Sequence, residues 1–307
     1  MSRRTLVTGG AGFIGSRLCE RLVERGDAVI SVDNYFAGSR EIRHRGVDYR
    51  EGHTRDVEKL VRETVDLVYH LGEYSRVERS VTEPQVVFDL NTIGTFSVLE
   101  FCRQSNPKLV YAGSSTKFAD GGLGRDQSPY AFTKATNSEL VRNYGEWYGI
   151  DYAITYFYNV YGPGERAGTY GTVIEIFRER RLRGEPLPVT SPGTQRRNFT
   201  HVDDIVDGLL LIGDKGKGDE FGLGASESFS ILEIAALFGG SVELRPEVPG
   251  NRMTAKLDVT KSHALGWEAK QSVRAYIAEA VAAAQSGHEQ NGRVQVSVEA
   301  AEGSARV

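Results

Sequence analysis

Short apolar runs rich in β-branched and aromatic residues alternate with longer stretches of helical periodicity through the first half of the chain. Five runs are predicted to be strands: 5–8, 28–32, 67–71, 108–112 and 152–157. Between the first two, apolar residues recur at helical spacing at Leu18, Leu22 and Val23. Further helices are expected over 57–64, 92–102 and 130–148. This alternation predicts an α/β fold, a Rossmann-type doubly wound parallel sheet with helices on both faces.

The pattern changes after Tyr161-Gly162-Pro163-Gly164, where glycine and proline become denser and the elements shorten. Residues 202–211 again have the pattern of a helix that packs on the sheet. We therefore expect a first domain made of 1–163 plus 201–224. A smaller, interleaved C-terminal α/β region is expected over 164–200 plus 225–285, followed by a disordered tail over 286–307, which lacks a sustained apolar pattern.

Composition and charge exclude several classes of protein. The chain has 307 residues, 40% hydrophobic and 25% charged, as is ordinary for a folded soluble protein. A net charge of −4 offers no basic face to nucleic acid or to an anionic membrane. No apolar run approaches the roughly 20 residues of a membrane span, and no signal peptide precedes the first strand. We expect a cytoplasmic protein in which Cys19 and Cys102 are buried free thiols, with no Cys/His spacing typical of a metal site.

A glycine-rich loop over residues 8–15 follows the first strand and opens the first helix. Its spacing is G-x-x-G-x-x-G, with glycines at Gly9, Gly12 and Gly15. Such a loop lets a pyrophosphate approach the backbone N–H groups of a helix N-terminus. Asp33 ends the next strand, 18 residues after Gly15, where a carboxylate accepts hydrogen bonds from an adenosine ribose. The pattern predicts NAD as the cofactor, although Arg40 and Arg43 leave NADP open and a glycine turn without a ligand is the alternative.

Tyr130 and Lys134 form a Y-x-x-x-K pair on a predicted helix, and residues four apart share one helix face. The ammonium would stabilise the phenolate, which can remove a hydroxyl proton while a hydride leaves the same carbon. Ser114 ends a strand 16 residues upstream of Tyr130 and could bond the same substrate oxygen. The three residues are the predicted catalytic set. The alternative is a surface lysine beside a half-buried tyrosine.

Taken together in this order, the motifs resemble the extended short-chain dehydrogenases/reductases, and within them the NAD-dependent sugar-nucleotide epimerase/dehydratase group, which is UDP-glucose 4-epimerase-like. The resemblance covers residues 4–280. It rests on the motifs at 8–15, 32–34, 70–72, 91–95, Ser114, Tyr130 with Lys134, 158–164, 195–199 with 203–204, and 265–267.

The resemblance implies a nucleotide-diphosphate sugar as substrate, and a homodimer formed through the helix over 92–102 and the helix that carries Tyr130. It implies cofactor contacts at Gly9, Gly12, Phe13, Ile14, Gly15, Asp33, Asn34, Leu71, Gly72, Asn91, Tyr130, Lys134 and Val160. It implies substrate contacts at Glu73, Ser114, Ser115, Tyr130, Asn159, Arg197 and Arg252.

The residues that follow the catalytic strand favour one reaction over another. The 4,6-dehydratases of the group carry Thr-Asp-Glu where this chain has Ser114, Ser115 and Thr116. Without those acids, the pattern favours a 4-epimerase that works through a transient 4-keto sugar.

Three alternatives stay open. Glu73 stands where the group has alanine, and it could be a substrate contact or an acid/base that restores a 4,6- or 5,6-elimination. A solvent-facing loop carboxylate is the other interpretation of Glu73. A non-catalytic NAD-binding scaffold is disfavoured by the complete Ser/Tyr/Lys set. An NADPH-dependent reductase is disfavoured by Asp33.

Overall fold

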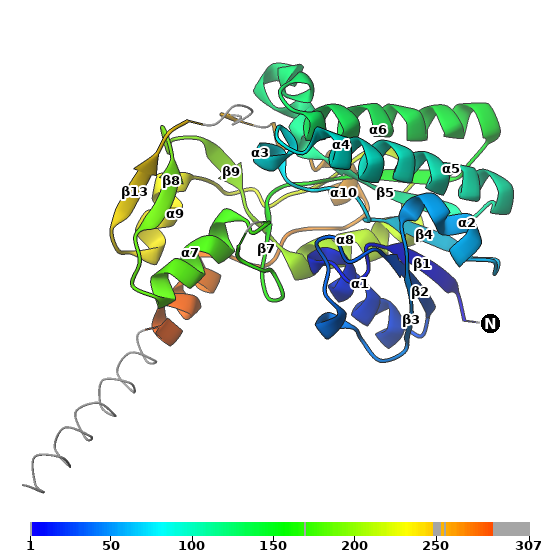
Figure 1. Cartoon of the computed structure of the whole chain (residues 1–307), viewed down its shortest axis with the longest axis horizontal. Helices are drawn as coiled ribbons and strands as arrows, with labels where there is room; N and C mark the ends of the chain where they lie inside the picture. The colour runs from blue at the N-terminus through cyan, green and yellow to red at the C-terminus, as the bar shows by residue number, and fades with distance from the viewer. Residues whose placement is uncertain (1, 169, 248–252, 255, 285–307) are drawn as a thin grey trace, which may run out of the picture.

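A seven-stranded, all-parallel sheet forms the core of the larger part of the molecule (Figure 1). The computed structural model describes residues 2–168, 170–247, 253–254 and 256–284. The strand order in the sheet is β11-β6-β5-β4-β1-β2-β3. The strands are β1 Arg4–Thr8, β2 Ala28–Asp33, β3 Val47–Glu51, β4 Leu67–His70, β5 Lys108–Ser114, β6 Tyr152–Phe157 and β11 Gly218–Leu223. The doubly wound fold class is confirmed, and the order reverses between β1 and β4.

Helices cover both faces of the sheet (Figure 1). One face carries α1 (Phe13–Glu24) and α8 (Val202–Lys215), and the other carries α2 (Val57–Leu60), α5 (Gly94–Ser105) and α6 (Pro129–Tyr148). Each layer buries its apolar stripe against the sheet. The buried residues of the two layers include Leu18, Leu22, Leu209 and Ile212 on one side, and Val98, Leu99, Val141 and Tyr144 on the other.

Helix α6 has strong capping residues at both ends, and the position of its N-terminus determines where Tyr130 lies. The hydroxyl of Ser128 accepts a hydrogen bond from the N–H of Ala131 at 3.2 Å, and Pro129 occupies the first turn. Gly149 ends the helix with φ of 72°. The observed bounds differ from the expected 130–148 by one residue at the start. The short elements around the sheet are η1 Arg40–Ile42, η2 Thr54–Asp56, α3 Val77–Ser80, α4 Pro84–Val87, η3 Phe88–Ile93, η4 Ser115–Phe118 and η5 Asp120–Asp126.

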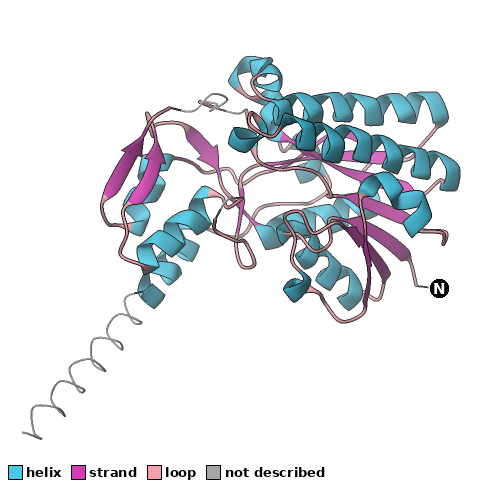
Figure 2. Ribbon diagram, viewed as in Figure 1, coloured by secondary structure: helices cyan, strands magenta, loops and turns pink. Residues whose placement is uncertain are grey.

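A smaller region stands beside the sheet domain (Figure 2). Its helices are α7 Val173–Leu182, α9 Ile231–Phe238 and a helix over 273–284. Its strand pairs are β8 Leu187–Thr190 with β13 Val242–Arg245, and β9 Arg196–Asn198 with β12 Ser228–Ser230. The region has its own core, which includes Ile174, Phe177, Leu187, Ile234 and Phe238. A two-residue ladder of β7 (Val160–Tyr161) and β10 (Thr200–His201) lies where the chain passes between the two parts.

One expected boundary needs correction. The chain after the second region returns to the sheet domain, because α10 (Thr260–Ala264) packs on β11 and Trp267 is buried in the core beneath α8. The indole N–H of Trp267 donates to the carbonyl of Asp204 at 2.8 Å. Assignment of all of 225–285 to the second region was therefore too coarse. The expected tail over 286–307 lies outside the described residues.

The two cysteines are placed as the sequence predicted. Cys19 and Cys102 are both buried and free, and burial raises the pKa of both thiols well above the ordinary value. Within the described ranges, no helix combines the length and the apolar character that crossing a membrane requires.

Candidate functional site

A cleft of about 530 Å³ lies at the carboxyl ends of the central strands. Open parallel sheets bind ligands there, because the crossover helices diverge where the strand order reverses. Most of the predicted site residues line it: Gly9, Gly12, Phe13, Ile14, Gly15, Asp33, Asn34, Leu71, Gly72, Glu73, Ser114, Ser115, Tyr130, Lys134, Asn159 and Val160. The cleft therefore joins the glycine loop to the Ser/Tyr/Lys set.

The glycine loop forms a cradle that side chains would fill. Gly9 has φ of 75°, and a Cβ there would lie 2.8 Å from the Cα of Gly72. A Cβ on Gly15 would lie 2.1 Å from the carbonyl oxygen of Gly9. Gly12 caps α1 without any side-chain hydrogen bond, and the first turn of α1 carries no acidic residue. The N–H groups of that turn are thus left for an anionic ligand.

Asp33 sits at the end of β2 with its carboxylate held in place. Its two oxygens accept the N–H groups of Ala11 at 2.9 Å and Tyr35 at 2.7 Å. Burial raises the pKa of Asp33, and these two donors oppose that rise. Each carboxylate oxygen keeps a lone pair for a ribose hydroxyl. Asn34 also lines the cleft, and its side-chain oxygen accepts the N–H of Phe36 at 3.1 Å. The cradle formed by the glycine loop therefore fits the pyrophosphate of a dinucleotide, and the carboxylate of Asp33 fits its adenosine ribose.

The predicted catalytic side chains come from two neighbouring elements. The hydroxyl oxygen of Ser114, at the end of β5, accepts the hydroxyl of Thr116 at 3.0 Å and its N–H at 3.3 Å. The hydroxyl proton of Ser114 therefore stays available to a ligand. Tyr130 lies in the first turn of α6 and packs with Tyr74 and other apolar side chains. Lys134, one turn later, donates to the carbonyl of Ala112 at 2.6 Å.

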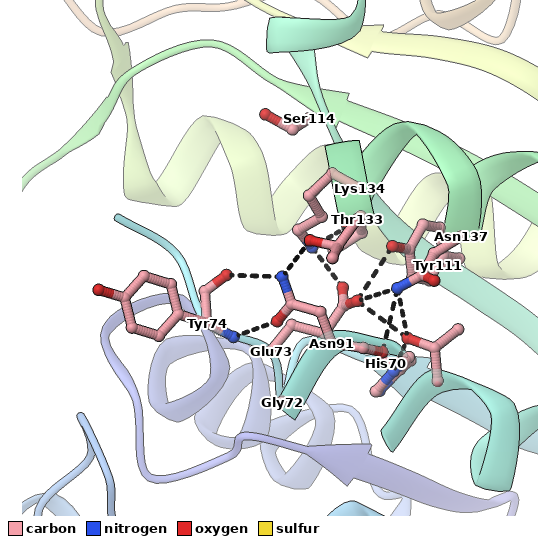
Figure 3. Close-up of polar contacts among 12 residues, drawn as sticks. His70, Gly72, Glu73, Tyr74, Asn91, Tyr111, Ser114, Thr133, Lys134 and Asn137 are labelled. Atoms are coloured by element: carbon pink, nitrogen blue, oxygen red, sulfur yellow. Dashed lines mark hydrogen bonds and ion pairs between the residues drawn. The ribbon is translucent and has the colours of Figure 1, made fainter. Parts of the chain in front are cut away.

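Glu73 is buried beside Lys134 (Figure 3). Its side chain is 1% exposed, and its carboxylate accepts a hydrogen bond from the Lys134 ammonium. It also accepts Thr95 Oγ1 at 2.9 Å, Asn137 Nδ2 at 2.9 Å and the Tyr111 hydroxyl at 3.1 Å. The interpretation of Glu73 as a solvent-facing loop carboxylate is therefore wrong. Three of these donors share Oε1, and the Lys134 ammonium is the one side-chain donor to Oε2 among the described residues.

Asn91 does not line the cleft, contrary to the expected cofactor contact. It is fully buried in η3, where its amide oxygen accepts the N–H of Tyr74 at 2.6 Å. Its amide nitrogen donates to Thr133 Oγ1 at 2.9 Å (Figure 3). Asn91 thus ties the segment after β4 to α6 from behind the cleft wall. The sequence motif identified a polar residue near the cleft, but the packing of η3 directs its side chain away from the cleft and into the protein interior.

The predicted substrate contacts have three different outcomes. Asn159 lines the cleft, with φ of 33°, and its amide donates to the carbonyl of Asn198 at 3.1 Å. Arg197, on β9, does not line the cleft, and its guanidinium donates to the carbonyl of Arg196 at 2.9 Å. Arg252 lies outside the described residues. Phosphate contacts by the two arginines stay predictions.

The cleft wall also carries Arg76 and Glu165, which the sequence did not single out. Glu165 is 8% exposed, and one of its oxygens accepts the N–H of Thr172 at 2.9 Å. The other oxygen has no hydrogen-bond partner among the described residues. Burial raises the pKa of Glu165 to about 7, although Thr172 and Arg76 oppose the rise. A single glutamate after a Gly-Pro-Gly turn has no spacing signal, so only the fold reveals it.

The chain matches the model of the NAD dependent epimerase/dehydratase family over residues 5–224. It belongs to that family. The match spans the glycine loop, Ser114, Tyr130 and Lys134, which the structure brings to one cleft. The family uses NAD, which the cradle around Gly9 and the carboxylate of Asp33 fit.

Similar proteins share the fold but carry out several reactions. UDP-glucuronic acid decarboxylase 2 of Arabidopsis thaliana is 31% identical over 293 residues, which cover 88% of this chain and 66% of that protein. UDP-glucose 4-epimerase of Thermus thermophilus, solved with NAD, is 30% identical with a TM-score of 0.82, covering 92% of this chain and 99% of that one.

The dTDP-glucose 4,6-dehydratase of Streptomyces venezuelae, also solved with NAD, is 27% identical with a TM-score of 0.81, covering 91% and 95% of the two chains. Family membership therefore establishes an NAD-dependent enzyme of the group that contains sugar-nucleotide epimerases, dehydratases and decarboxylases. It does not select the reaction.

Proposed function

We propose that this protein is an NAD-dependent epimerase that inverts the 4-position of a nucleotide-diphosphate sugar through a transient 4-keto sugar. The observation that carries the proposal is the composition of the cleft. Ser114, Tyr130 and Lys134 line it together with the glycine loop. The chain after β5 adds only the hydroxyl groups of Ser115 and Thr116 there, and an epimerase needs no further acid at that place.

The side chains have separate tasks in this reaction. Bound NAD supplies a hydride acceptor that becomes the hydride donor of the return step. Tyr130, as phenolate, accepts the proton of the 4-hydroxyl, while Ser114 donates a hydrogen bond to the same oxygen. The proton returns from Tyr130 after the ketone has presented its other face. Proton and hydride are both restored, so the net change is inversion alone.

A second candidate is an elimination, and Glu165 is the observation that favours it. The expected acid for that reaction was Glu73, but its carboxylate is occupied by four donors. Glu165, on the cleft wall, has instead a buried oxygen without a hydrogen-bond partner among the described residues. With a pKa raised to about 7, its carboxyl can both donate and accept a proton near neutral pH. A dehydratase needs such a group for the proton and the leaving hydroxyl.

Proton NMR in deuterated water distinguishes the two candidates. Purified protein is incubated with UDP-, GDP-, CDP- and TDP-sugars, including UDP-glucuronic acid, without added cofactor. A new stereoisomer that gains no deuterium supports the 4-epimerase. Loss of water with deuterium entering beside a carbonyl would replace it with the dehydratase. Loss of carbon dioxide would place the chain with the decarboxylases instead.

The variant Glu165→Gln sharpens this experiment. It keeps the size of the side chain and removes its ability to exchange a proton. An epimerase should keep its stereochemical outcome in this variant, with turnover changed by less than about tenfold. An elimination that uses Glu165 should lose on the order of 10²–10⁴ in rate, the usual contribution of a general acid or base.

We further propose a homodimer formed through α5 and α6, as expected from the sequence. Four large apolar side chains on η3, α5 and α6 are 41–48% exposed: Phe88, Ile93, Phe96 and Phe132. The rings of Phe88 and Phe132 lie 6.2 Å apart, so part of this surface is contiguous. Grouped apolar side chains on the outer face of two helices are typical of an interface between protein chains.

A further inference from the structure

Every polar neighbour that contacts the Glu73 carboxylate is a donor. Lys134, Asn137, Thr95 and Tyr111 each donate to it. Burial and the Glu73 carboxylate raise the pKa of Tyr111 well above the ordinary value, so its hydroxyl keeps the proton that it donates. The ammonium of Lys134 and the amide nitrogen of Asn137 can only donate, so two of the four bonds require an accepting carboxylate oxygen. The structure thus holds the Glu73 carboxylate in direct contact with the Lys134 ammonium.

The hydrogen bonds behind Glu73 fix its orientation from the sheet side. Thr95 gives its only hydroxyl proton to Glu73, so the His70 Nε2, 3.0 Å from Thr95 Oγ1, must carry a proton and donate. His70 Nδ1 then accepts Thr8 Oγ1 at 2.7 Å, and Thr8 in turn accepts the N–H of Gly72 at 3.0 Å. Burial lowers the pKa of His70 to about 4, which keeps the ring neutral in this role. The chain of bonds runs from the end of β1 to the carboxylate.

We propose that Glu73 is a positioning residue that offsets the charge of Lys134 and thereby sets the pH at which Tyr130 becomes a base. The proposal rests on the proposed function in one respect only, namely that Tyr130 is the base. The family group has alanine at the position of Glu73. With alanine there, the ammonium of Lys134 would lie near Tyr130 without a carboxylate beside it. Here the ammonium and the carboxylate form a pair whose net charge is zero.

The sign of the effect follows from electrostatics. A lone ammonium favours the phenolate of Tyr130, whereas a carboxylate beside that ammonium opposes a second negative charge. Glu73 therefore moves the ionisation of Tyr130 to higher pH than Lys134 alone would. The other titratable or charged groups around this pair are His70 from β4, Tyr74 and Arg76 from the segment after β4, Tyr111 from β5, and Glu165 and Tyr170 from the segment after β7.

None of these groups takes over the role of Glu73: Glu165 is close enough to interact with Arg76, and it forms no ion pair with Lys134 among the described residues. Arg76 keeps its positive charge and favours the phenolate, as Lys134 does. Neutral His70 and the protonated Tyr111 add no charge. Burial and its bond to Glu83 raise the pKa of Tyr74, which stays protonated as well. Glu73 is thus the anionic side chain in contact with Lys134 among the described residues.

The test is an ultraviolet titration of phenolate absorbance near 295 nm, in protein saturated with NAD. The difference between the wild-type protein and Tyr130→Phe isolates the signal of Tyr130. In Glu73→Gln, which keeps the shape and removes the charge, the midpoint of that signal should move about one pH unit lower. If the midpoint stays in place or moves higher, the proposal is overturned.

Two further variants separate charge from structure. Glu73→Asp keeps the carboxylate on a shorter side chain, so its midpoint should lie nearer to the wild type than that of Glu73→Gln. If Glu73 had a purely structural role, the two variants would show equally displaced titration midpoints, or both would lose NAD. Glu146→Gln removes the same charge from an exposed position 12 residues along α6, about 18 Å away, and should leave the midpoint unchanged.

The experiments distinguish failure of the role proposed for Glu73 from failure of the proposed function. The ultraviolet titration needs no sugar substrate, so it reports on Glu73 even if none of the nucleotide sugars is converted. Where turnover is measurable, the acid limb of the rate profile for Glu73→Gln should shift by the same amount and in the same direction. At pH values well below that limb, the variant should then be about tenfold faster than the wild type, because the rate there follows the phenolate fraction.

Discussion

At the scale of single residues, the chemistry in the cleft depends on which groups the ammonium of Lys134 contacts. Its ammonium donates to Glu73 and to the carbonyl of Ala112. An ammonium has three donors, so one remains for a ligand or for Tyr130. The buried carboxylate thus fixes the lysine before any substrate arrives, which limits the reorganisation that the reaction requires.

The variant Tyr130→Phe removes one oxygen and leaves the packing of the ring with Tyr74, Val87 and Leu90 in place. We expect it to fold and to bind NAD, while turnover falls by about 10³ or more because the base is lost. Tyr148→Phe, at an exposed position near the end of the same helix, is the matched control and should keep wild-type turnover. Steady-state rates by NMR provide the measurement, and a fully active Tyr130→Phe would refute the mechanism.

The neighbouring residues Arg196 and Arg197 allow a paired test of substrate binding. Arg196 forms an ion pair with Glu233 at 3.0 Å, whereas Arg197 is the predicted phosphate contact. Arg197→Ala should raise KM for the nucleotide sugar by about tenfold or more, since charge-assisted bonds to phosphate are lost. NAD retention should change little. Arg196→Ala should leave KM within about twofold, and equal KM values in both variants would argue against the phosphate contact.

At the scale of elements, the junction of β1 and α1 determines cofactor binding. The strand ends at Thr8, the helix begins at Phe13, and the loop between them packs against the backbone of Gly72 after β4. Three elements therefore meet around a few glycines. No side chain fits at that meeting point, because the backbones approach within contact distance of one another.

A methyl group at Gly15 should break this arrangement. In Gly15→Ala the new Cβ would lie 2.1 Å from the carbonyl oxygen of Gly9, so the loop must shift. We expect NAD affinity to fall at least about a hundredfold, as measured by titration calorimetry on protein freed of nucleotide. Glu24→Ala, at an exposed position at the far end of α1, should bind NAD like the wild type. Unchanged affinity in Gly15→Ala would contradict the cradle.

At the scale of the whole molecule, the cleft stands between a sheet domain and a region that the chain enters and leaves. The sheet domain presents the glycine loop, Tyr130 and Lys134. Segments that follow β6 add Asn159 and Glu165 to the cleft lining. Trp267 anchors the chain beneath α8 before it enters the helix over 273–284, so the sheet domain holds the chain on both sides of the segment from β12 to β13.

The proposed dimer can be tested with one charge. Phe96→Glu places a carboxylate on the exposed face of α5, and burying it unpaired would weaken association by roughly a hundredfold or more. We expect a dimer for the wild type and a monomer for the variant in light scattering coupled to size exclusion. Leu244→Glu, at an exposed position on β13 in the second region, should stay dimeric. A wild-type monomer would contradict the dimer outright.

Local signals in the sequence were sufficient for the inner sheet and for much of the cleft. The five expected strands are β1, β2, β4, β5 and β6, whose continuous apolar runs reflect burial on both faces. The edge strands β3 and β11 were missed because their sequences, VDYRE and GDEFGL, mix polar residues and glycine with apolar ones. Edge strands are less buried, so they carry a weaker pattern.

By itself the sequence determined the glycine loop, Asp33 and the Ser/Tyr/Lys set, because each depends on spacing within one element or one turn. Only the tertiary structure decided that Asn91 faces inward, that Glu73 lies against Lys134 and that Glu165 reaches the cleft. The first two of these placements depend on elements that pack together across 17 to 64 positions of sequence. Spacing along a chain carries no record of such distant partners, whereas burial and hydrogen bonding in the folded state do.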